Sequence, residues 1–243
     1  MTLIRVINPN TSRAMTAAIG RTARAVAAPA VAVEAVCPSM GPASIESRYD
    51  EALALPGILS LVTAGEPAGV DGYVIACFGD PGLAAAREIA CGPVVGIAEA
   101  AMHLATFLGR SFSVVTTLSR TVGATWELAR SYGFARACAG VHASDIPVLD
   151  LDSADARASI AKACAAAKEA DGCDVIVLGC AGMTGLAASL SGELGIPVVD
   201  GVAAAVKTVE SLTALGLRTS KRGEYAPPPA KPVIGLLAEF ARA

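Results

Sequence analysis

Two stretches of this 243-residue sequence match each other: DGYVIACFGDPGLAA at residues 71–85 and DVIVLGCAGMTGLAA at residues 174–188. Each begins with an aspartate, continues as an apolar run that ends at a cysteine, and passes through glycines into Gly-Leu-Ala-Ala. The similarity continues further on, where Pro-Val-Val occurs at 93–95 and again at 197–199. A spacing of about one hundred residues is too long for a solenoid repeat. The sequence therefore predicts two copies of one lobe, with Cys77 and Cys180 at the same point in each.

Short β-branched runs alternate with Ala-rich stretches of helical length on both sides of these segments. Such alternation favours parallel sheets that are covered by helices on both faces. We expect strands at residues 3–7, 31–36, 73–76, 94–97, 112–116, 139–143, 175–178 and 197–199, and helices at 12–27, 49–64, 83–90, 99–108, 122–132, 154–169, 185–190 and 202–214. The predicted fold class is α/β, with two pseudo-symmetric lobes and an active site in the cleft between them.

The domain organisation follows from the duplication and from a change in composition near the end. We expect an N-terminal lobe at 1–105 and a C-terminal lobe at 106–205. From Thr219 the sequence becomes Ser-Lys-Arg-Gly and then Ala-Pro-Pro-Pro, which rules out a helix or sheet interior. We predict that 206–243, a helix followed by this Pro-rich tail, packs back on the N-terminal lobe, with the apolar segment 233–240 docking afterwards.

Composition excludes several classes of protein. With 53% hydrophobic residues and a net charge of −3, the chain is too apolar for disorder and lacks the positive field that nucleic-acid binding needs. Charged residues interrupt every apolar stretch before it reaches the length of a membrane span, so no membrane interaction is expected. The N-terminal residues lack the pattern of a signal peptide, and we therefore predict a cytoplasmic protein.

The cysteines do not indicate a disulfide framework or a metal site. Their number, seven, is odd, no Cys-x-x-Cys occurs, and His103 and His142 have no such partner nearby. We expect reduced thiols, no metal and no thiol redox role. Five of the seven are assigned to packing: Cys37, Cys91, Cys138, Cys164 and Cys173.

Cys77 and Cys180 differ because they recur at matched positions of the duplication. Ligands of open α/β sheets bind beyond the carboxyl ends of the strands, so both thiols are expected to face a cleft. Each precedes a Gly-containing turn into a helix, whose positive end lowers the pKa of a thiol from about 8.5 toward neutrality. Two sulfurs on opposite sides of one ligand provide a base and an acid, which is the geometry of a cofactor-free racemase.

The sequence resembles the aspartate/glutamate racemase superfamily, and within it the hydantoin racemases, over nearly the whole chain. The segments that carry this resemblance are VINPNT at 6–11, GPASIES at 41–47, ACFGDPG at 76–82, VVGIAEAA at 94–101, VVTT at 114–117, LGCAGM at 178–183 and PVVDG at 197–201. Amino-acid racemases of the superfamily typically have Asn-Thr after the first cysteine and Thr after the second. This chain has Phe78-Gly79 and Ala181-Gly182 instead. The difference disfavours an amino-acid substrate.

The resemblance implies racemisation without a cofactor at C5 of a 5-substituted hydantoin, with Cys77 and Cys180 as the acid/base pair. Removing the C5 proton moves negative charge onto the C4 oxygen, which then needs hydrogen-bond donors. The backbone N–H groups of four residues are candidate donors: Phe78, Gly79, Ala181 and Gly182. Further candidate binding residues lie at strand ends, where they equally suit a helix cap or strand packing: Asn8, Asn10, Thr11, Thr116 and Thr117.

Several alternatives stay open at this point. Allantoin, a ureido-substituted hydantoin, is an equally suitable substrate, and related reactions are amino-acid racemisation and cofactor-free decarboxylation. The non-enzymatic alternative is a two-lobed protein that binds a small molecule. Ser44 and Glu46 lie in a loop that is able to cover the cleft and rank lower as site residues. Three cations, Lys207, Lys221 and Arg222, are expected at the surface, so no carboxylate clamp is predicted, and the apolar helices suit a homo-oligomer.

Overall fold

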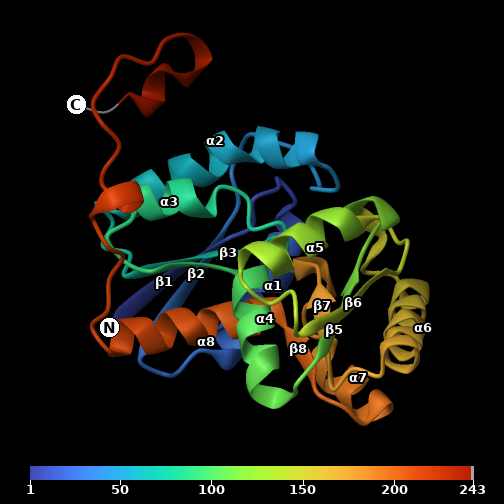
Figure 1. Cartoon of the computed structure of the whole chain (residues 1–243). Coiled ribbons are helices and arrows are strands. Elements are labelled where there is room, and N and C mark those ends of the chain that lie inside the picture. Colours follow the sequence, from blue (N-terminus) through green and yellow to red (C-terminus); the bar gives the residue numbers. More distant parts are fainter. Residues whose placement is uncertain (242–243) are drawn as a thin grey trace.

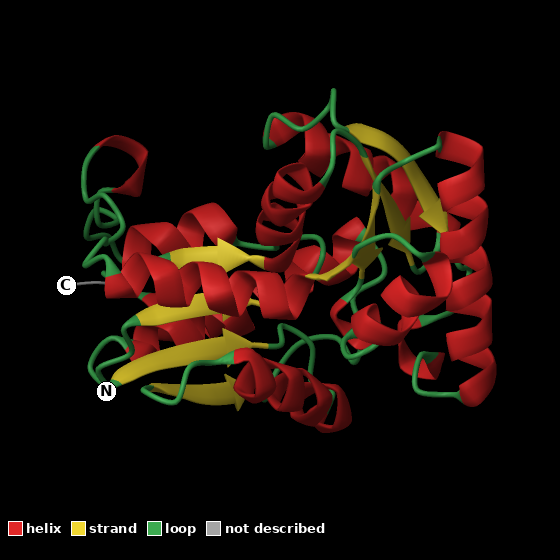
Figure 2. Cartoon of the chain, turned by 90° about the horizontal axis from the view of Figure 1, so that it is seen from below, coloured by secondary structure: helices red, strands yellow, loops and turns green. Residues whose placement is uncertain are grey.

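The computed structural model describes residues 1–241 as two four-stranded parallel sheets that are flanked by helices (Figure 1). The first sheet has the order β2-β1-β3-β4 and the second has the order β6-β5-β7-β8. The same arrangement of strands is therefore repeated in the two halves of the chain. Figure 2 shows the sheets as two separate groups of arrows with helices on both sides. The predicted α/β class with two similar lobes is confirmed.

The elements of the first half are β1 (Thr2–Ile7), α1 (Arg13–Val26), β2 (Val31–Val36), α2 (Arg48–Gly65), β3 (Gly72–Ile75), α3 (Leu83–Ile89), β4 (Val94–Gly96) and α4 (Ile97–Leu108). Those of the second half are β5 (Phe112–Thr116), α5 (Val122–Ser131), β6 (Cys138–Ala143), α6 (Ala154–Asp171), β7 (Val175–Gly179), α7 (Ala187–Leu194), β8 (Val198–Asp200) and α8 (Gly201–Ala214). The side chains of β3 and β7 are all buried, as expected for central strands of a parallel sheet.

Local sequence sets several helix starts. Ser12, Ser47 and Ser153 each accept a hydrogen bond from a backbone N–H of the first turn, so α1, α2 and α6 begin with side-chain caps. The helix expected at 185–190 begins later, at Ala187, and extends to Leu194. The reason is that 181–183 form a short 3₁₀ turn and Gly185 adopts a φ of 82°, which a helix cannot contain.

The last helix of each half covers the sheet of the other half. Helix α4 follows β4 of the first sheet but packs on β5, β7 and β8, whereas α8 follows β8 and packs on β1, β3 and β4. The two helices also pack against each other. Buried side chains of both sheets and of both helices form one continuous cluster, in which each aliphatic side chain contributes about 1.5 to 3 kcal/mol by burial. The two lobes therefore share a core.

The segment after α8 returns to the first lobe. Thr219 Oγ1 donates to the carbonyl of Gly92, and Lys221 Nζ donates to the carbonyl of Arg87 at 2.7 Å. The ring of Tyr225 then lies 5.9 Å from the Arg87 guanidinium. Beyond it the chain passes α2 and α3, with Leu236 fully exposed (Figure 1). Within residues 1–241 no helix has the length and apolar character that crossing a membrane requires.

Candidate active site

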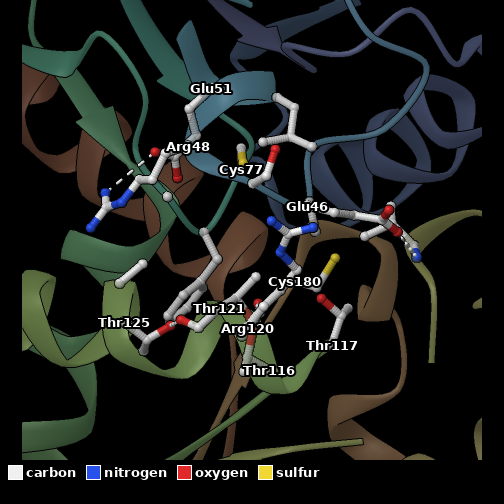
Figure 3. A pocket seen from close by; sticks show the side chains of 18 of the residues that line it. Glu46, Arg48, Glu51, Cys77, Thr116, Thr117, Arg120, Thr121, Thr125 and Cys180 are labelled. Carbon is white, nitrogen blue, oxygen red and sulfur yellow. Dashed lines mark hydrogen bonds and ion pairs between the residues drawn. The ribbon is translucent and has the colours of Figure 1, made fainter. Parts of the chain in front are cut away.

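A cavity of about 390 Å³ lies between the two lobes and is lined by residues from both. Cys77 and Cys180 both line it, and Figure 3 shows the two sulfurs entering from different parts of the chain. Cys77 lies two residues beyond the end of β3, and Cys180 lies directly after β7. Because β3 and β7 hold the same place in the two sheets, matched strand ends bring the two thiols to one cavity.

Each cysteine sits at the start of a tight turn that points backbone N–H groups toward its sulfur. The Gly182 N–H donates to the sulfur of Cys180 at 3.3 Å, while the Met183 N–H donates to the Cys180 carbonyl at 3.1 Å. At the other thiol, the Gly79 N–H stabilises the charged form of Cys77. The sequence predicted such donors, because each cysteine precedes a Gly-containing turn into a helix.

The expected lowering of the thiol pKa values is wrong. Burial raises the pKa of Cys77 well above its ordinary range, and burial raises the pKa of Cys180 to about 11. The N–H donors oppose this shift but do not cancel it. Removing a thiolate from water costs more than one or two backbone hydrogen bonds return. Burial therefore favours the protonated form of both thiols at neutral pH.

Carboxylates strengthen this effect. Glu51 and Asp80 raise the pKa of Cys77, Glu46 raises that of Cys180, and a charge on Cys180 raises the pKa of Cys77 further. The two thiols consequently disfavour being ionised together.

Asp80 links the loop of Cys77 to two helices. Its carboxylate accepts from the Ala98 and Glu99 N–H groups at the start of α4 and from Tyr132 Oη at 2.8 Å. Burial raises its pKa to about 7, although these three donors oppose the shift. Asp80 therefore joins the loop that follows Cys77 to the helix that covers the second sheet.

Most of the predicted binding residues line the cavity: Asn8, Asn10, Phe78, Gly79, Thr116, Thr117 and Ala181. Asn8 is almost fully buried, and its Nδ2 donates to Asn10 Oδ1, Ser12 O and Thr16 Oγ1, whereas its Oδ1 has no partner among the described residues. Thr116 Oγ1 lies 2.9 Å from Thr121 Oγ1, so this hydroxyl is already occupied within the protein.

Two predicted binding residues are absent from the cavity wall. The hydroxyl of Thr11 donates to the carbonyl of Pro42 at 3.3 Å, which holds the neighbouring loop. Gly182 gives its N–H to the sulfur of Cys180 and lies behind it. Both groups serve the local turns, and the ligand contact that the sequence suggested for them stays a prediction.

Sequence reasoning missed several charged residues of the site. Arg48, Glu51, Arg120 and Glu127 line the cavity together with Glu46, which had been ranked low. Arg120, a cation that the sequence analysis did not single out, extends into the cavity (Figure 3). Arg120 follows Thr116 and Thr117 in the loop after β5. The rule that pointed to those threonines, the carboxyl end of a parallel strand, also applied to Arg120.

Contacts between the two lobes close one side of the cavity. Glu46 Oε1 accepts from the Val148 N–H at 2.7 Å, and Arg48 forms an ion pair with Glu127. Glu46 and Arg48 belong to the loop and helix after β2 in the first lobe, whereas Val148 and Glu127 belong to the second lobe. The loop at 41–47 therefore contributes to the cavity wall, with Ile45, Glu46 and Ser47 facing inward.

The histidines lie outside this site. His103 Nδ1 contacts the Glu99 carbonyl, and His142 Nε2 lies 2.7 Å from Asp171. Within residues 1–241, His, Cys, Asp and Glu side chains nowhere gather in a group of three or more that suits a metal ion. Two thiols and several charged side chains line the cavity itself.

These features define a two-lobed α/β enzyme with two cysteines in the cleft between its lobes, and the chain belongs to the Asp/Glu/hydantoin racemase family. The model of that family matches residues 4–209.

Individual relatives are more specific. A protein of Pseudomonas sp. (strain NS671) named hydantoin racemase is 46% identical over 242 residues, covering 98% of this chain and 97% of its own. The solved structure of allantoin racemase from Klebsiella pneumoniae is 53% identical and superposes with a TM-score of 0.97 over 99% of both chains. Arylmalonate decarboxylase, at 19% identity and a TM-score of 0.69 over 93% of this chain and 97% of its own, shares the fold.

Proposed function

We propose that this protein racemises 5-substituted hydantoins at C5 without a cofactor, with Cys77 and Cys180 as its two bases. The observation that supports this most directly is that matched cysteines from both lobes line one cavity. One sulfur, as thiolate, removes the C5 proton from one face of the ring. The other, as thiol, delivers its own proton to the opposite face. The reaction inverts C5, exchanges the protonation states of the two sulfurs and is equally available in reverse.

The intermediate needs stabilisation of its C4 oxygen. The backbone N–H groups of Phe78 and Ala181, two residues that line the cavity, are our candidate donors to it, and removing one comparable donor costs about 3 to 4 kcal/mol of transition-state stabilisation. The Gly79 N–H acts on the Cys77 sulfur, and the Gly182 N–H donates to the Cys180 sulfur. There it stabilises the thiolate form of the base.

Relatives support both substrates that the sequence left open. Proteins named hydantoin racemase and a structure named allantoin racemase are similar to almost all of this chain. Decarboxylation is the weaker alternative, since arylmalonate decarboxylase resembles the chain at the level of the fold. We further propose a cytoplasmic location and a homo-oligomeric assembly, as expected from the sequence.

A deuterium experiment tests the proposal. One enantiomer of 5-isopropylhydantoin, and in parallel one of allantoin, is incubated with the purified protein in deuterated buffer. We expect optical rotation to decay to zero and the inverted product to carry deuterium at C5, because the incoming proton comes from a thiol that has exchanged with solvent. Rotation that persists for every hydantoin tested, or inversion that leaves the original hydrogen at C5, contradicts the two-base mechanism.

The pH dependence follows from the raised pKa values. The base must be a thiolate, and burial raises the pKa of Cys180 to about 11, so below that pH the reactive fraction grows about tenfold per pH unit. We expect log(kcat/KM) to rise with a slope near one from about pH 6 to about pH 9. Higher pH is avoided, because thiols with raised pKa values ionise on unfolding and so destabilise the fold above about pH 8.5. A flat profile, or a maximum near neutrality, contradicts this prediction.

A further inference from the structure

The charged groups of the cavity are not equally paired. Arg48 contacts both Glu51 and Glu127, so its charge is matched within the protein. Arg120 has no hydrogen-bond or ion-pair partner among residues 1–241, although it lines the same cavity. Glu46 gives one carboxylate oxygen to the Val148 N–H, and its other oxygen has no protein partner there. The cavity therefore presents one guanidinium and one carboxylate oxygen that a ligand can use.

Arg120 is held at a defined place. It is the middle residue of a short 3₁₀ turn at Ser119–Thr121. Asp145 Oδ1 accepts from both the N–H and the hydroxyl of Ser119, at 2.8 and 2.6 Å. On the other side, the hydroxyl of Thr121 donates to the Leu118 carbonyl and contacts Thr116. Both neighbours of Arg120 are thus anchored, and its side chain extends from this turn into the cavity (Figure 3).

An alkyl or aryl group is a poor match for this surface. It displaces water from the guanidinium of Arg120 and from the free oxygen of Glu46 without offering a partner to either. Unpaired charges that lose their water are costly. A substituent with a carbonyl oxygen and an N–H group offers a partner to both the guanidinium and the carboxylate oxygen. A hydrogen bond to a charged group contributes more than a hydrogen bond between two neutral groups.

We propose that Arg120, together with Glu46, selects hydantoins whose 5-substituent carries both an acceptor oxygen and an N–H, as a ureido or carboxamide group does. Arg120 donates to the acceptor oxygen, and Glu46 accepts from the N–H. This inference rests on the proposed racemisation at C5, because it assigns these residues to the substituent of that same ring. Allantoin is the hydantoin whose ureido group matches this pair.

The test compares allantoin with 5-isopropylhydantoin, a substrate of the same ring that lacks polar atoms in its substituent. We measure kcat/KM on both for the wild type, Arg120→Met, Arg120→Lys and Glu46→Gln. Glu46→Gln keeps an oxygen for the Val148 N–H and removes the charge. Arg136→Met is the matched control, since Arg136 is another exposed arginine, has no hydrogen-bond or ion-pair partner among residues 1–241 and lies outside the cavity.

We expect Arg120→Met to reduce kcat/KM for allantoin by about 10- to 100-fold, mainly through KM, the effect of one hydrogen bond to a charged group. The loss on 5-isopropylhydantoin is expected to be at least tenfold smaller. Arg120→Lys keeps part of the allantoin activity, Glu46→Gln shifts the substrate ratio in the same direction as Arg120→Met, and Arg136→Met leaves the ratio unchanged.

The outcomes separate this inference from the proposed function. Equal losses on the two substrates in Arg120→Met, or a wild type that prefers 5-isopropylhydantoin, overturn the role of Arg120 while racemisation at C5 stands. A wild type that racemises neither compound overturns the proposed function itself.

Discussion

Replacing Cys77 or Cys180 with alanine is expected to lower racemisation by about 10²- to 10⁴-fold, the usual contribution of a positioned acid or base. Each replacement removes the only proton carrier on one face of the ring. The remaining sulfur reaches its own face alone, so a proton that it removes returns to the face it left. Optical rotation followed with allantoin and with 5-isopropylhydantoin measures this loss.

The two variants are expected to differ in which enantiomer they still exchange. In deuterated buffer, Cys77→Ala slowly introduces deuterium at C5 of one enantiomer with retention of configuration, and Cys180→Ala does so with the other enantiomer. NMR of the recovered substrate distinguishes the two. This opposite selectivity is the signature of two bases on opposite faces, and a general loss of structure does not produce it.

Cys91→Ala is the matched control, because Cys91 is exposed and lies outside the cavity. It is expected to keep full activity. Unchanged melting temperatures show that the active-site variants fold. If both variants exchange the same enantiomer, or if either one racemises at the wild-type rate, the pairing of Cys77 with Cys180 is incorrect.

The largest effect on stability is expected from Asp200→Ala. Asp200 is buried at the end of β8, and one of its carboxylate oxygens accepts from the Val202 and Ala203 N–H groups of α8. The other accepts from Thr184 Oγ1 at 2.8 Å and from the Gly185 N–H at 2.9 Å. A single side chain thus ties the helix that covers the first sheet to the loop that follows Cys180.

Alanine at this position removes a helix cap and leaves four donors without their acceptor. A lost cap costs about 1 kcal/mol, and buried donors left unpaired cost about 1 to 3 kcal/mol each where water does not reach them. We expect the free energy of unfolding to fall by about 4 kcal/mol, which corresponds to a melting temperature about 8 to 16 °C lower. Chemical denaturation and calorimetry measure the two quantities.

Two further variants make the interpretation specific. Asp200→Asn keeps one oxygen for the α8 cap and is expected to lose roughly half as much stability. Asp152→Ala removes an exposed aspartate whose side chain has no hydrogen-bond or ion-pair partner in the described part of the chain, and it is expected to change the free energy of unfolding by less than about 0.5 kcal/mol. If the Asp200→Ala protein is as stable as the Asp152→Ala protein, water replaces the Asp200 carboxylate both at the start of α8 and at the loop that follows Cys180.

Local sequence was sufficient for most of the fold. The β-branched runs predicted the strands because a parallel sheet buries both faces, and the Ala-rich stretches of helical length predicted the helices. Local sequence was insufficient for α4 and α8. These two helices run across the boundaries that we expected near residues 105 and 206. An Ala-rich apolar helix face fits either sheet. Which sheet the helix covers depends on the connecting loops and on the space that the other elements leave.

At the site, the repeat located both cysteines, but it did not predict the direction in which their thiol pKa values are shifted. A turn rich in N–H groups is visible in the sequence and argues for a low thiol pKa. The burial that raises the pKa, and the carboxylates of Glu46 and Glu51, come from parts of the chain that are distant from the cysteine they act on, whereas Asp80 directly follows the turn of Cys77. Arg120 escaped notice because an unpaired arginine looks like any surface arginine until the fold brings it to a cavity that both lobes line.

The sequence by itself determined the periodic pattern of strands and helices, the duplication and the place of one cysteine in each copy, because hydrophobic periodicity and strand-end position are properties of neighbouring residues. Only the tertiary structure decided which helix covers which sheet, which charges meet in the cavity and in which direction the thiol pKa values move. Those depend on how much water is excluded and on which charges approach, and both are set by residues that are far apart along the chain.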